Sequence, residues 1–541
     1  MRTPSLLADF THARPCKSFC EKYLTLPKKK QDQYTVYERH GQLVLALNSE
    51  IMLPENAPVR LLSAQLEELE YGKLYEAYSS KGRKSAAEPR VLFKVLVHGY
   101  LCGIYSSRKL EEACQYRIDF RWLLEDRKAP DHSTLARFRT GRCKEAVEDL
   151  FYQFVRKLEE AGETDHKAVF LDGTKLESRA GRYTFVWRKS VEKQLARIKE
   201  RLKTLTGLTT SAEVRSLQEE EAGEIVFVRG TGKRKSQAQR DWEEKQALLE
   251  RWERYEAMLS TMGEGRNSCS KTDPDATFMR MKEDHMRNGQ LKPGYNVQIA
   301  VNSEYITGLE AFPDRTDVRT LRPMLEKLSQ RHQARYEEVV ADAGYESLEN
   351  YLYLERNGQM CFIKPANYDQ KRTRKFQKQV GRIENMKYDP EEDSFTCAQG
   401  RKLYLRRETT EVQDGQLVST ALYRCEDCSG CPCRAQCCRA KDPDRPKELV
   451  LKKTFWEKRE QAEKNIMTQR GLHLRLCRSI QVEGAFGLLK NDFGFRRFLT
   501  WGKANIRTEL FLLALAFDLK KLWMKREQGR LQTRVSMKMT S

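Results

Sequence analysis

Apolar residues recur at three- and four-residue spacing from Val59 to about Gly162, and this period predicts a domain built of helices. Within it, a strongly apolar segment is followed by a short turn at Tyr105 to Ser107 and then by a second helix. Asp131 stands where a helix-capping residue is expected, before a further amphipathic segment. A helix, a tight turn and a helix can enter the major groove of DNA, with Arg137 and Arg139 exposed near a helix start. A plain helical bundle fits the same pattern equally well.

The pattern changes at Lys167, where short apolar runs typical of strands begin to alternate with helical segments. One strand is predicted to end at Asp172 and another at Asp342, and strand character also covers residues 295–313. Hairpin strands followed by strand–helix–strand units predict an α/β layered domain. Near the C-terminus two more helices are predicted, and the apolar run from Leu510 to Phe517 indicates that the second is deeply buried.

Two stretches of different composition interrupt this α/β pattern. Residues 190–265 are highly charged and predict a solvated helical hairpin, whereas residues 370–455 are basic and rich in cysteine. The predicted layout is an irregular lead over 1–55, a helical DNA-binding domain over 56–163, an α/β domain over 164–525 with a helical insertion at 190–265 and a cysteine-rich insertion at 370–455, and a basic tail over 526–541.

The net charge of the chain gives the clearest indication of its partner. Its 541 residues carry a formal net charge of +21, and a basic excess of this size attracts polyanions, of which nucleic acid is the commonest. A basic but otherwise ordinary enzyme is the alternative. No stretch approaches the roughly 18 apolar residues that a membrane helix needs. Since a signal-peptide pattern is also lacking at the N-terminus, we expect a cytoplasmic, nucleoid-associated protein without a membrane partner.

The strand ends carry the candidate chemistry. Asp172 and Asp342 each follow an apolar strand, and side chains at the carboxyl ends of strands in an open sheet share a crevice. Two carboxylates in one crevice repel each other unless they are protonated or bridged by a cation, and Mg²⁺ suits them. Glu483 is the best candidate for a third acid because apolar residues flank it on a predicted helix. Lys490 comes seven residues after Glu483, and we expect it on the same face of the helix. There it could neutralise a phosphate.

The cysteines point to a second metal. Seven of the fifteen lie between Cys397 and Cys438, and a disulfide framework is not expected in a cytoplasmic chain. The segment "YRCEDCSGCPCRAQCCRA" contains overlapping two-residue knuckles of the kind that bind zinc. The candidate set for a structural Zn²⁺ is Cys425, Cys428, Cys431 and Cys437, with Cys433 and Cys438 as alternatives to the last two. A reduced cluster without metal is the competing interpretation.

Four ordered segments make the chain recognisable. They are "LDGTKLESRAGRYTFVWRKS", "TDPDATFMRMKEDHMRNGQLKPGYNVQIA", "VVADAGYES" and "RSIQVEGAFGLLKNDFGFRRFLTWGKANIRTELFLLALA". They resemble bacterial insertion-sequence transposases of the IS eleven-eighty-two type, within the wider group that has an RNase H-like catalytic domain and an Asp-Asp-Glu triad. The helical stretch before them looks like the N-terminal domain of that family, so the resemblance covers roughly residues 45 to 525.

The resemblance implies that Asp172, Asp342 and Glu483 are the metal-binding triad of an RNase H-like mixed sheet with flanking helices. It implies two Mg²⁺ (or Mn²⁺) ions, cleavage at transposon ends and joining of the ends to target DNA. The expected partner is double-stranded DNA, bound by a homodimer that brings two ends together. Two other functions fit the same residues: a metal-dependent nuclease without strand transfer, and a non-catalytic DNA-binding protein derived from a transposase.

The chain also departs from the wider group. Lys490 matches a lysine found after the glutamate, but Leu476 and Ser479 stand where a tyrosine and an arginine are often found, with Arg475 and Arg478 as candidate substitutes. Asp518 replaces an expected amide, which we expect to affect packing.

Basic residues around the acids are predicted to contact phosphates. This group comprises Lys175, Lys490, Arg496, Arg497, Lys503 and Arg507. Tyr345 and Trp501 could stack on an unpaired base, although ordinary packing is favoured for each, and His285 is expected to be structural.

Overall fold

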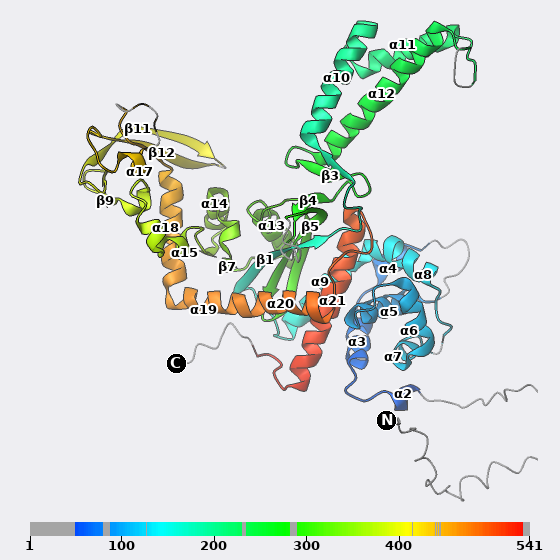
Figure 1. The fold of residues 1–541 in the computed structure, drawn as a ribbon. Coiled ribbons are helices and arrows are strands. Elements are labelled where there is room, and N and C mark those ends of the chain that lie inside the picture. The colour runs from blue at the N-terminus through cyan, green and yellow to red at the C-terminus, as the bar shows by residue number, and fades with distance from the viewer. Residues whose placement is uncertain are drawn as a thin grey trace, which may run out of the picture. The chain divides into compact units, whose positions relative to one another are not determined.

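The structure is a computed structural model that describes residues 49–78, 87–125, 127–229, 234–281, 289–413, 415–438, 440, 442 and 445–533 (Figure 1). By its internal contacts the chain divides into Met1–Asn48 and Ser49–Ser541, and the following description concerns the second unit. The expected lead up to residue 48, His285 and the last residues of the expected tail lie outside the described residues. None of the helices within these ranges is long and apolar enough to cross a membrane.

The predicted helical domain consists of short helices around a central apolar one. α5 (Pro89–Leu101) is buried over almost its whole length, and its polar residues Lys94 and His98 are buried against the acids Glu67 and Asp119. Asp131 caps α8 by accepting a hydrogen bond of 2.6 Å from the Thr134 amide. The helices of this part are α2 (Ser49–Met52), α3 (Pro58–Glu67), α4 (Gly72–Glu76), α5, α6 (Ser107–Tyr116), α7 (Ile118–Leu123), α8 (His132–Arg137), the π-helical turn η1 (Phe138–Arg142) and α9 (Cys143–Glu160).

The central sheet is mixed, and its strand order is β6-β5-β1-β7-β8. β1 is antiparallel to β5 and β5 to β6, whereas β1 is parallel to β7 and β7 to β8. β4 pairs with the first residues of β5. The strands are β1 (Ala168–Glu177), β4 (Thr277–Arg280), β5 (Leu291–Asn302), β6 (Tyr305–Phe312), β7 (Glu338–Ala341) and β8 (Met360–Ile363).

Alternating residues of the sheet are buried on opposite faces. Phe170 and Val340 belong to one core with α21 (Lys503–Glu527), whereas Val169 and Val339 belong to another with α13 (Leu321–His332) and α14 (Leu348–Arg356). The first core continues into α5 and α9, so the helical domain and the sheet share one apolar interior. α21 is buried from Leu510 to Leu519, as its unbroken apolar run predicts.

The charged stretch after β1 contains three helices instead of the predicted pair. α10 (Arg188–Thr206), α11 (Ser211–Glu224) and α12 (Gln237–Met262) surround a small core of their own (Figure 1). The stretch begins and ends at a two-stranded ladder of β2 (Phe185–Trp187) and β3 (Ser268–Ser270).

The cysteine-rich stretch forms a second sheet, which the sequence pattern does not predict. Its strand order is β13-β12-β11-β10-β9, and its core contains Phe395, Leu403 and Tyr423. The elements of this part are α15 (Tyr368–Lys371), α16 (Arg374–Gln377), the 3-10 turn η3 (Ile383–Asn385), β9 (Lys387–Asp389), β10 (Ser394–Thr396), β11 (Lys402–Gln413), β12 (Gln416–Cys425), α17 (Arg434–Cys437) and β13 (Glu448–Leu451).

A broken helical segment returns the chain to the first sheet. It comprises α18 (Lys453–Met467), α19 (Gln469–Arg478), the π-helical turn η4 (Ser479–Glu483), α20 (Gly484–Gly487) and a second π-helical turn, η5 (Leu488–Asp492). The predicted single helix around Glu483 is thus interrupted twice. Turns of this kind insert an extra residue into a helix and are frequent at functional sites.

Candidate active site

Asp172 and Asp342 lie at the same level of two neighbouring parallel strands. The register pairs Phe170 of β1 with Val340 of β7, and each aspartate follows two residues later. Asp342 directly follows β7, whereas Asp172 lies within β1. The prediction that this strand ends at Asp172 is wrong, because its pairing with β5 continues to Glu177. Since alternate residues of a strand point to the same face, both carboxylates belong on the face that Phe170 and Val340 occupy. Asp172 is 8% exposed as a residue, and the side chain of Asp342 is 39% exposed. The predicted crevice therefore has one buried and one accessible carboxylate.

Arg478, the last residue of α19, contacts both aspartates. Its Nη2 atom lies 3.1 Å from Asp172 Oδ2 and 3.8 Å from Asp342 Oδ2. The guanidinium thus provides the counter-charge that two carboxylates in one crevice require. The sequence pointed to Arg478 as a substitute for the missing arginine, and here its side chain lies between the two acids.

Glu483 is the last residue of η4, five residues beyond Arg478. That spacing equals one π-helical turn, so the two residues follow each other along the same segment. The carboxylate of Glu483 accepts a hydrogen bond of 3.1 Å from Ser479 Oγ, and the residue is exposed. The expectation that its apolar neighbours shield it is wrong, because Val482 and Ala485 face the core while Glu483 faces outward.

The structure therefore brings the two aspartates together and leaves Glu483 outside their contact. Among the described residues, two groups of three potential ligands have their ligand atoms within 4.8 Å of one another. They are His98, Cys102 and Asp119, and Glu159, His166 and His332, and neither group contains a residue of the predicted triad.

A fourth acid, Asp317, lies at the same edge of the sheet. Its Oδ1 atom accepts hydrogen bonds from the side-chain amides of Asn296 (2.7 Å) and Gln298 (2.8 Å) of β5. A Cβ atom at Gly344 would lie 3.0 Å from Asp342 Oδ1 and 3.3 Å from Asp317 Oδ2, so these two carboxylates flank the glycine. Sequence reasoning missed Asp317, which comes five residues after the end of β6 and so does not adjoin an apolar strand.

Tyr345 also lies at this edge of the sheet. It is buried, and its hydroxyl donates a hydrogen bond to the side-chain carbonyl of Gln298. Burial, together with the charges of Asp317, Asp172 and Asp342, raises the pKa of Tyr345 well above its ordinary value. The phenol consequently stays neutral and acts as a fixed donor within the acidic cluster.

Glycine is required next to Asp172. A Cβ atom at Gly173 would lie 2.1 Å from the Gln298 amide nitrogen and 2.7 Å from Asp317 Oδ1. Any side chain there would displace the amide that holds Asp317, so Gly173 allows the acids of this edge to approach one another.

The predicted phosphate contacts near Glu483 have different environments. Arg496 is exposed, whereas the Arg497 guanidinium donates to the carbonyl oxygens of Ser178 and Arg179, both at 3.0 Å. Lys490 lines a cavity whose other walls are largely apolar, so it does not share the outward face of Glu483 as expected. The intervening π-helical turn changes the period on which that expectation depended.

Two arginines predicted to contact DNA instead bind other residues of the protein. Arg139 is only 7% exposed and donates a hydrogen bond of 2.7 Å to the Tyr105 carbonyl, because η1 turns it inward. The prediction that it is exposed is wrong. Arg507 forms ion pairs with Glu148 (2.6 Å) and Glu310 (3.4 Å), which already neutralise its charge.

The remaining basic candidates are more accessible. Arg137 and Lys503 are exposed and Lys175 is half-buried, at a strand position on the opposite face from Asp172. Trp501 is 57% exposed and precedes α21.

The fold and this edge define a mixed α/β protein in which two neighbouring parallel strands carry acids around a cationic side chain. Two family models match the chain: one described as Transposase domain (DUF772) over residues 47–141, and one described as Transposase DDE domain over residues 396–523. The two matches indicate a DDE transposase of the insertion-sequence type. The second match includes Glu483, whereas Asp172 and Asp342 lie outside both ranges. No curated protein and no solved structure matches the chain.

Proposed function

We propose that this transposase, of the IS eleven-eighty-two type, binds the two ends of a transposon, cleaves phosphodiester bonds there and joins the ends to target DNA. The observation that carries the proposal is the pair of aspartates at the same level of two neighbouring parallel strands, both in contact with the Arg478 guanidinium. Glu483 follows one π-helical turn later on the same segment. A modest displacement of that segment would bring Glu483 to the two aspartates in place of Arg478.

The strand order supports an RNase H-like catalytic domain. Three antiparallel strands, β6, β5 and β1, continue into two strands parallel to β1, with one acid within β1 and the other directly after β7. In this proposal the α10–α12 segment is an insertion between β1 and β5, and the β9–β13 sheet is an insertion between β8 and α18.

Asp172, Asp342 and Glu483 would hold two divalent ions, Mg²⁺ or Mn²⁺. The donor set fits because hard oxygen ligands suit these cations, and because the two aspartates already contact a cationic group. Bound ions would make water or a 3′-hydroxyl a stronger nucleophile and stabilise the leaving oxygen.

The chain's own residues position this chemistry. Asn296 and Gln298 fix Asp317, which keeps a further negative charge beside Asp342. Arg478 neutralises the aspartates until a cation replaces it. In this proposal the exposed side chains of Arg496 and Lys503 bind phosphates beside the scissile bond. Holding the bond in line supplies much of the rate enhancement.

The partner in this proposal is double-stranded DNA, both as transposon ends and as target. Transposases act on DNA, and the +21 charge favours its capture. The helical domain would read the ends, with Arg137 exposed beside α8. A homodimer is expected on DNA because two ends must be brought together.

The test is a strand-transfer assay with a duplex that ends in the transposon's terminal repeat and carries a free 3′-hydroxyl. Asp172→Ala, Asp342→Ala and Glu483→Ala should each lower cleavage and joining by more than ~100-fold and leave duplex binding nearly unchanged. Asp241→Ala is the matched control, since that exposed acid lies on α12 and accepts a hydrogen bond of 2.8 Å from Gln237.

The outcomes separate the alternatives. Cleavage without joining would identify a nuclease, and binding without cleavage by the unmodified chain would identify a DNA-binding relative. Undiminished cleavage by all three alanine variants would overturn the assignment of the triad.

A further inference from the structure

Four thiols of the cysteine-rich sheet gather around one small core. Cys425 is buried in that core, and Cys397, Cys428 and Cys437 pack against it. Cys397 lies in the β10–β11 turn, and Cys425 is the last residue of β12. Cys428 lies in the loop after β12, and Cys437 is the last residue of α17. Among the described residues, Cys431 is absent from this packing.

Strand pairing brings Cys397 to the end of β12. The register pairs Thr396 with Lys402 and Leu403 with Cys425. The turn is closed by a hydrogen bond of 2.9 Å from the Cys397 amide to the Arg401 carbonyl. Cys397 is therefore a neighbour of Cys425 in space although it is far from it in sequence.

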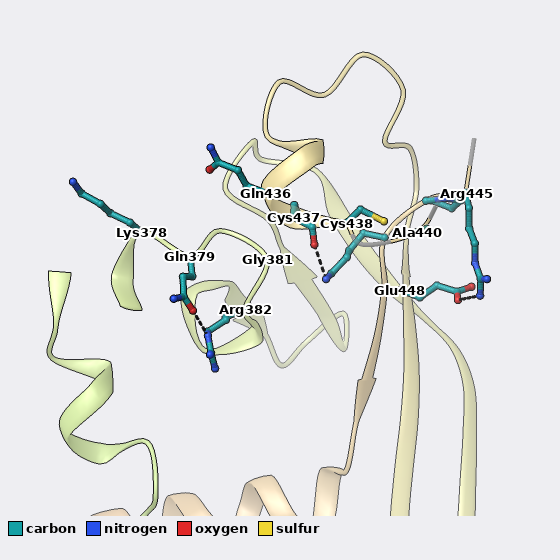
Figure 2. A pocket seen from close by; sticks show the side chains of 12 residues that line it. Lys378, Gln379, Gly381, Arg382, Gln436, Cys437, Cys438, Ala440, Arg445 and Glu448 are labelled. Atoms are coloured by element: carbon teal, nitrogen blue, oxygen red, sulfur yellow. Dashed lines mark hydrogen bonds and ion pairs between the residues drawn. The ribbon is translucent and has the colours of Figure 1, made fainter. Parts of the chain in front are cut away.

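Lys447 connects the remaining thiols. Its backbone amide donates to Cys428 Sγ at 3.3 Å, and its carbonyl accepts a hydrogen bond of 2.9 Å from the Cys425 amide. Its Nζ atom donates to the Cys437 carbonyl at 2.8 Å (Figure 2). A backbone N–H aimed at a sulfur stabilises a thiolate, and such outer contacts accompany metal ligands.

Among the described residues, no three of these four sulfur atoms lie within 4.8 Å of one another. A bound metal ion would therefore draw the thiols closer together than they are in this structure.

We propose that Cys397, Cys425, Cys428 and Cys437 bind one Zn²⁺ ion as a closed structural site. Four sulfur ligands leave no open position for substrate, so the ion would hold the turn, the loop and α17 together. This set keeps three of the cysteines that the sequence suggested and replaces Cys431 by Cys397. Cys433 is left out of the set because, among the described residues, it does not pack against the core that the four thiols share.

The site would shape the groove of about 760 Å³ shown in Figure 2. Cys437 and Cys438 form part of its wall, with Lys378, Arg382, Arg445 and Lys447 around them. A Cβ atom at Gly381 would lie 2.7 Å from the Cys437 carbonyl oxygen, so the basic loop packs directly against the proposed ligand. Loss of the metal should therefore loosen the basic wall of the groove.

Elemental analysis of the full chain, purified without chelators, tests the proposal. We expect about one zinc ion per chain and X-ray absorption with sulfur neighbours near ~2.3 Å. Cys397→Ser, Cys425→Ser, Cys428→Ser and Cys437→Ser should each lose most of the zinc. Cys431→Ser, Cys433→Ser and Cys438→Ser should keep it, and circular dichroism should report whether each variant folds.

Three results would overturn the proposal. They are a folded protein that contains no zinc and takes up none after Zn²⁺ is added, iron in place of zinc, and zinc loss in Cys431→Ser with retention in Cys425→Ser. Because metal content is measured without DNA, this outcome is independent of cleavage and strand transfer.

Discussion

Arg478 occupies the position at which the two catalytic candidates need positive charge. Two carboxylates on neighbouring strands repel each other, and at an effective dielectric constant of about 20 unit charges ~4 Å apart interact by about 4 kcal/mol. The guanidinium, 3.1 Å from Asp172 and 3.8 Å from Asp342, offsets that repulsion. The same contact makes Arg478 a competitor of any divalent ion at this edge.

Replacement of Arg478 by alanine should tighten the binding of Mn²⁺ and lower the melting temperature of the metal-free protein. Both effects follow from removal of the only cationic group in contact with both aspartates among the described residues. Paramagnetic resonance of free Mn²⁺ and thermal unfolding measure them without DNA. Arg475→Ala is the matched control, because Arg475 stacks on Tyr368 at 5.1 Å instead. Weaker Mn²⁺ binding in Arg478→Ala than in the control would contradict this role.

Asp518 predicts a pH dependence of stability. It is fully buried on α21, its Oδ1 atom accepts a hydrogen bond of 2.8 Å from the Ile306 amide, and burial raises its pKa well above its ordinary value of 3.8. A raised pKa stabilises the folded state fully below pH 3.8, and this contribution is lost as the pH rises toward the folded-state value, at ~1.4 kcal/mol per pH unit. An amide keeps the hydrogen bond without the charge.

Asp518→Asn should therefore melt higher than the unmodified chain, by an amount that grows as the pH rises from 4 toward 8. Thermal unfolding at several pH values measures the difference. A difference that is constant with pH would show that Asp518 does not carry a raised pKa.

The helices differ in how far their own sequence determines which residues are buried. α21 is apolar around its whole circumference and is buried against α9, α5 and β6. The segment from α18 to η5 is amphipathic but interrupted by π-helical turns, and these turns decide that Arg478 faces the acids while Glu483 faces outward. An extra residue in a helix rotates everything that follows it.

The groove beside the cysteine-rich sheet gives a prediction at the scale of this element. Joint replacement of Lys378 and Arg382 by alanine should weaken duplex binding and reduce the slope of log affinity against log salt by about 2, because each lost phosphate contact lowers it by ~1. Joint replacement of Arg240 and Arg251, exposed on α12, removes the same charge and serves as the control. Equal slopes for the two double variants, measured by fluorescence anisotropy, would exclude the groove as a DNA contact.

At the scale of the whole molecule, the helical domain and the mixed sheet share one apolar core. Residues of α5, α9, β5, β6 and α21 all belong to it. The sequence pattern separated a helical domain from an α/β domain at about residue 163, and the element types agree with that division. The common core means that the end-reading and catalytic parts of the proposed transposase would move together.

Much of this arrangement could be predicted from local patterns. The strand end before Asp342, the capped helix after Asp131 and the buried run in α21 all depend on residues close in sequence. The strand at Asp172 was also predictable, but not its continuation to Glu177, because that depends on pairing with β5. The five-stranded cysteine-rich sheet could not be predicted, since its longest strand, β11, is largely polar and the pairing of its strands depends on register. Asp317 was missed because it comes five residues after the end of β6 and so does not adjoin an apolar strand.

By itself, the sequence determined the types of element, the basic character and the acids that follow apolar runs, because periodicity, capping and charge are local properties. Only the tertiary structure decided that Arg478 bridges Asp172 and Asp342, that Arg139 is buried, and that Cys397 joins the thiols beyond β12. These contacts join residues far apart in the chain. They depend on strand register and on the rotation of helices as they pack, which no short stretch of sequence specifies.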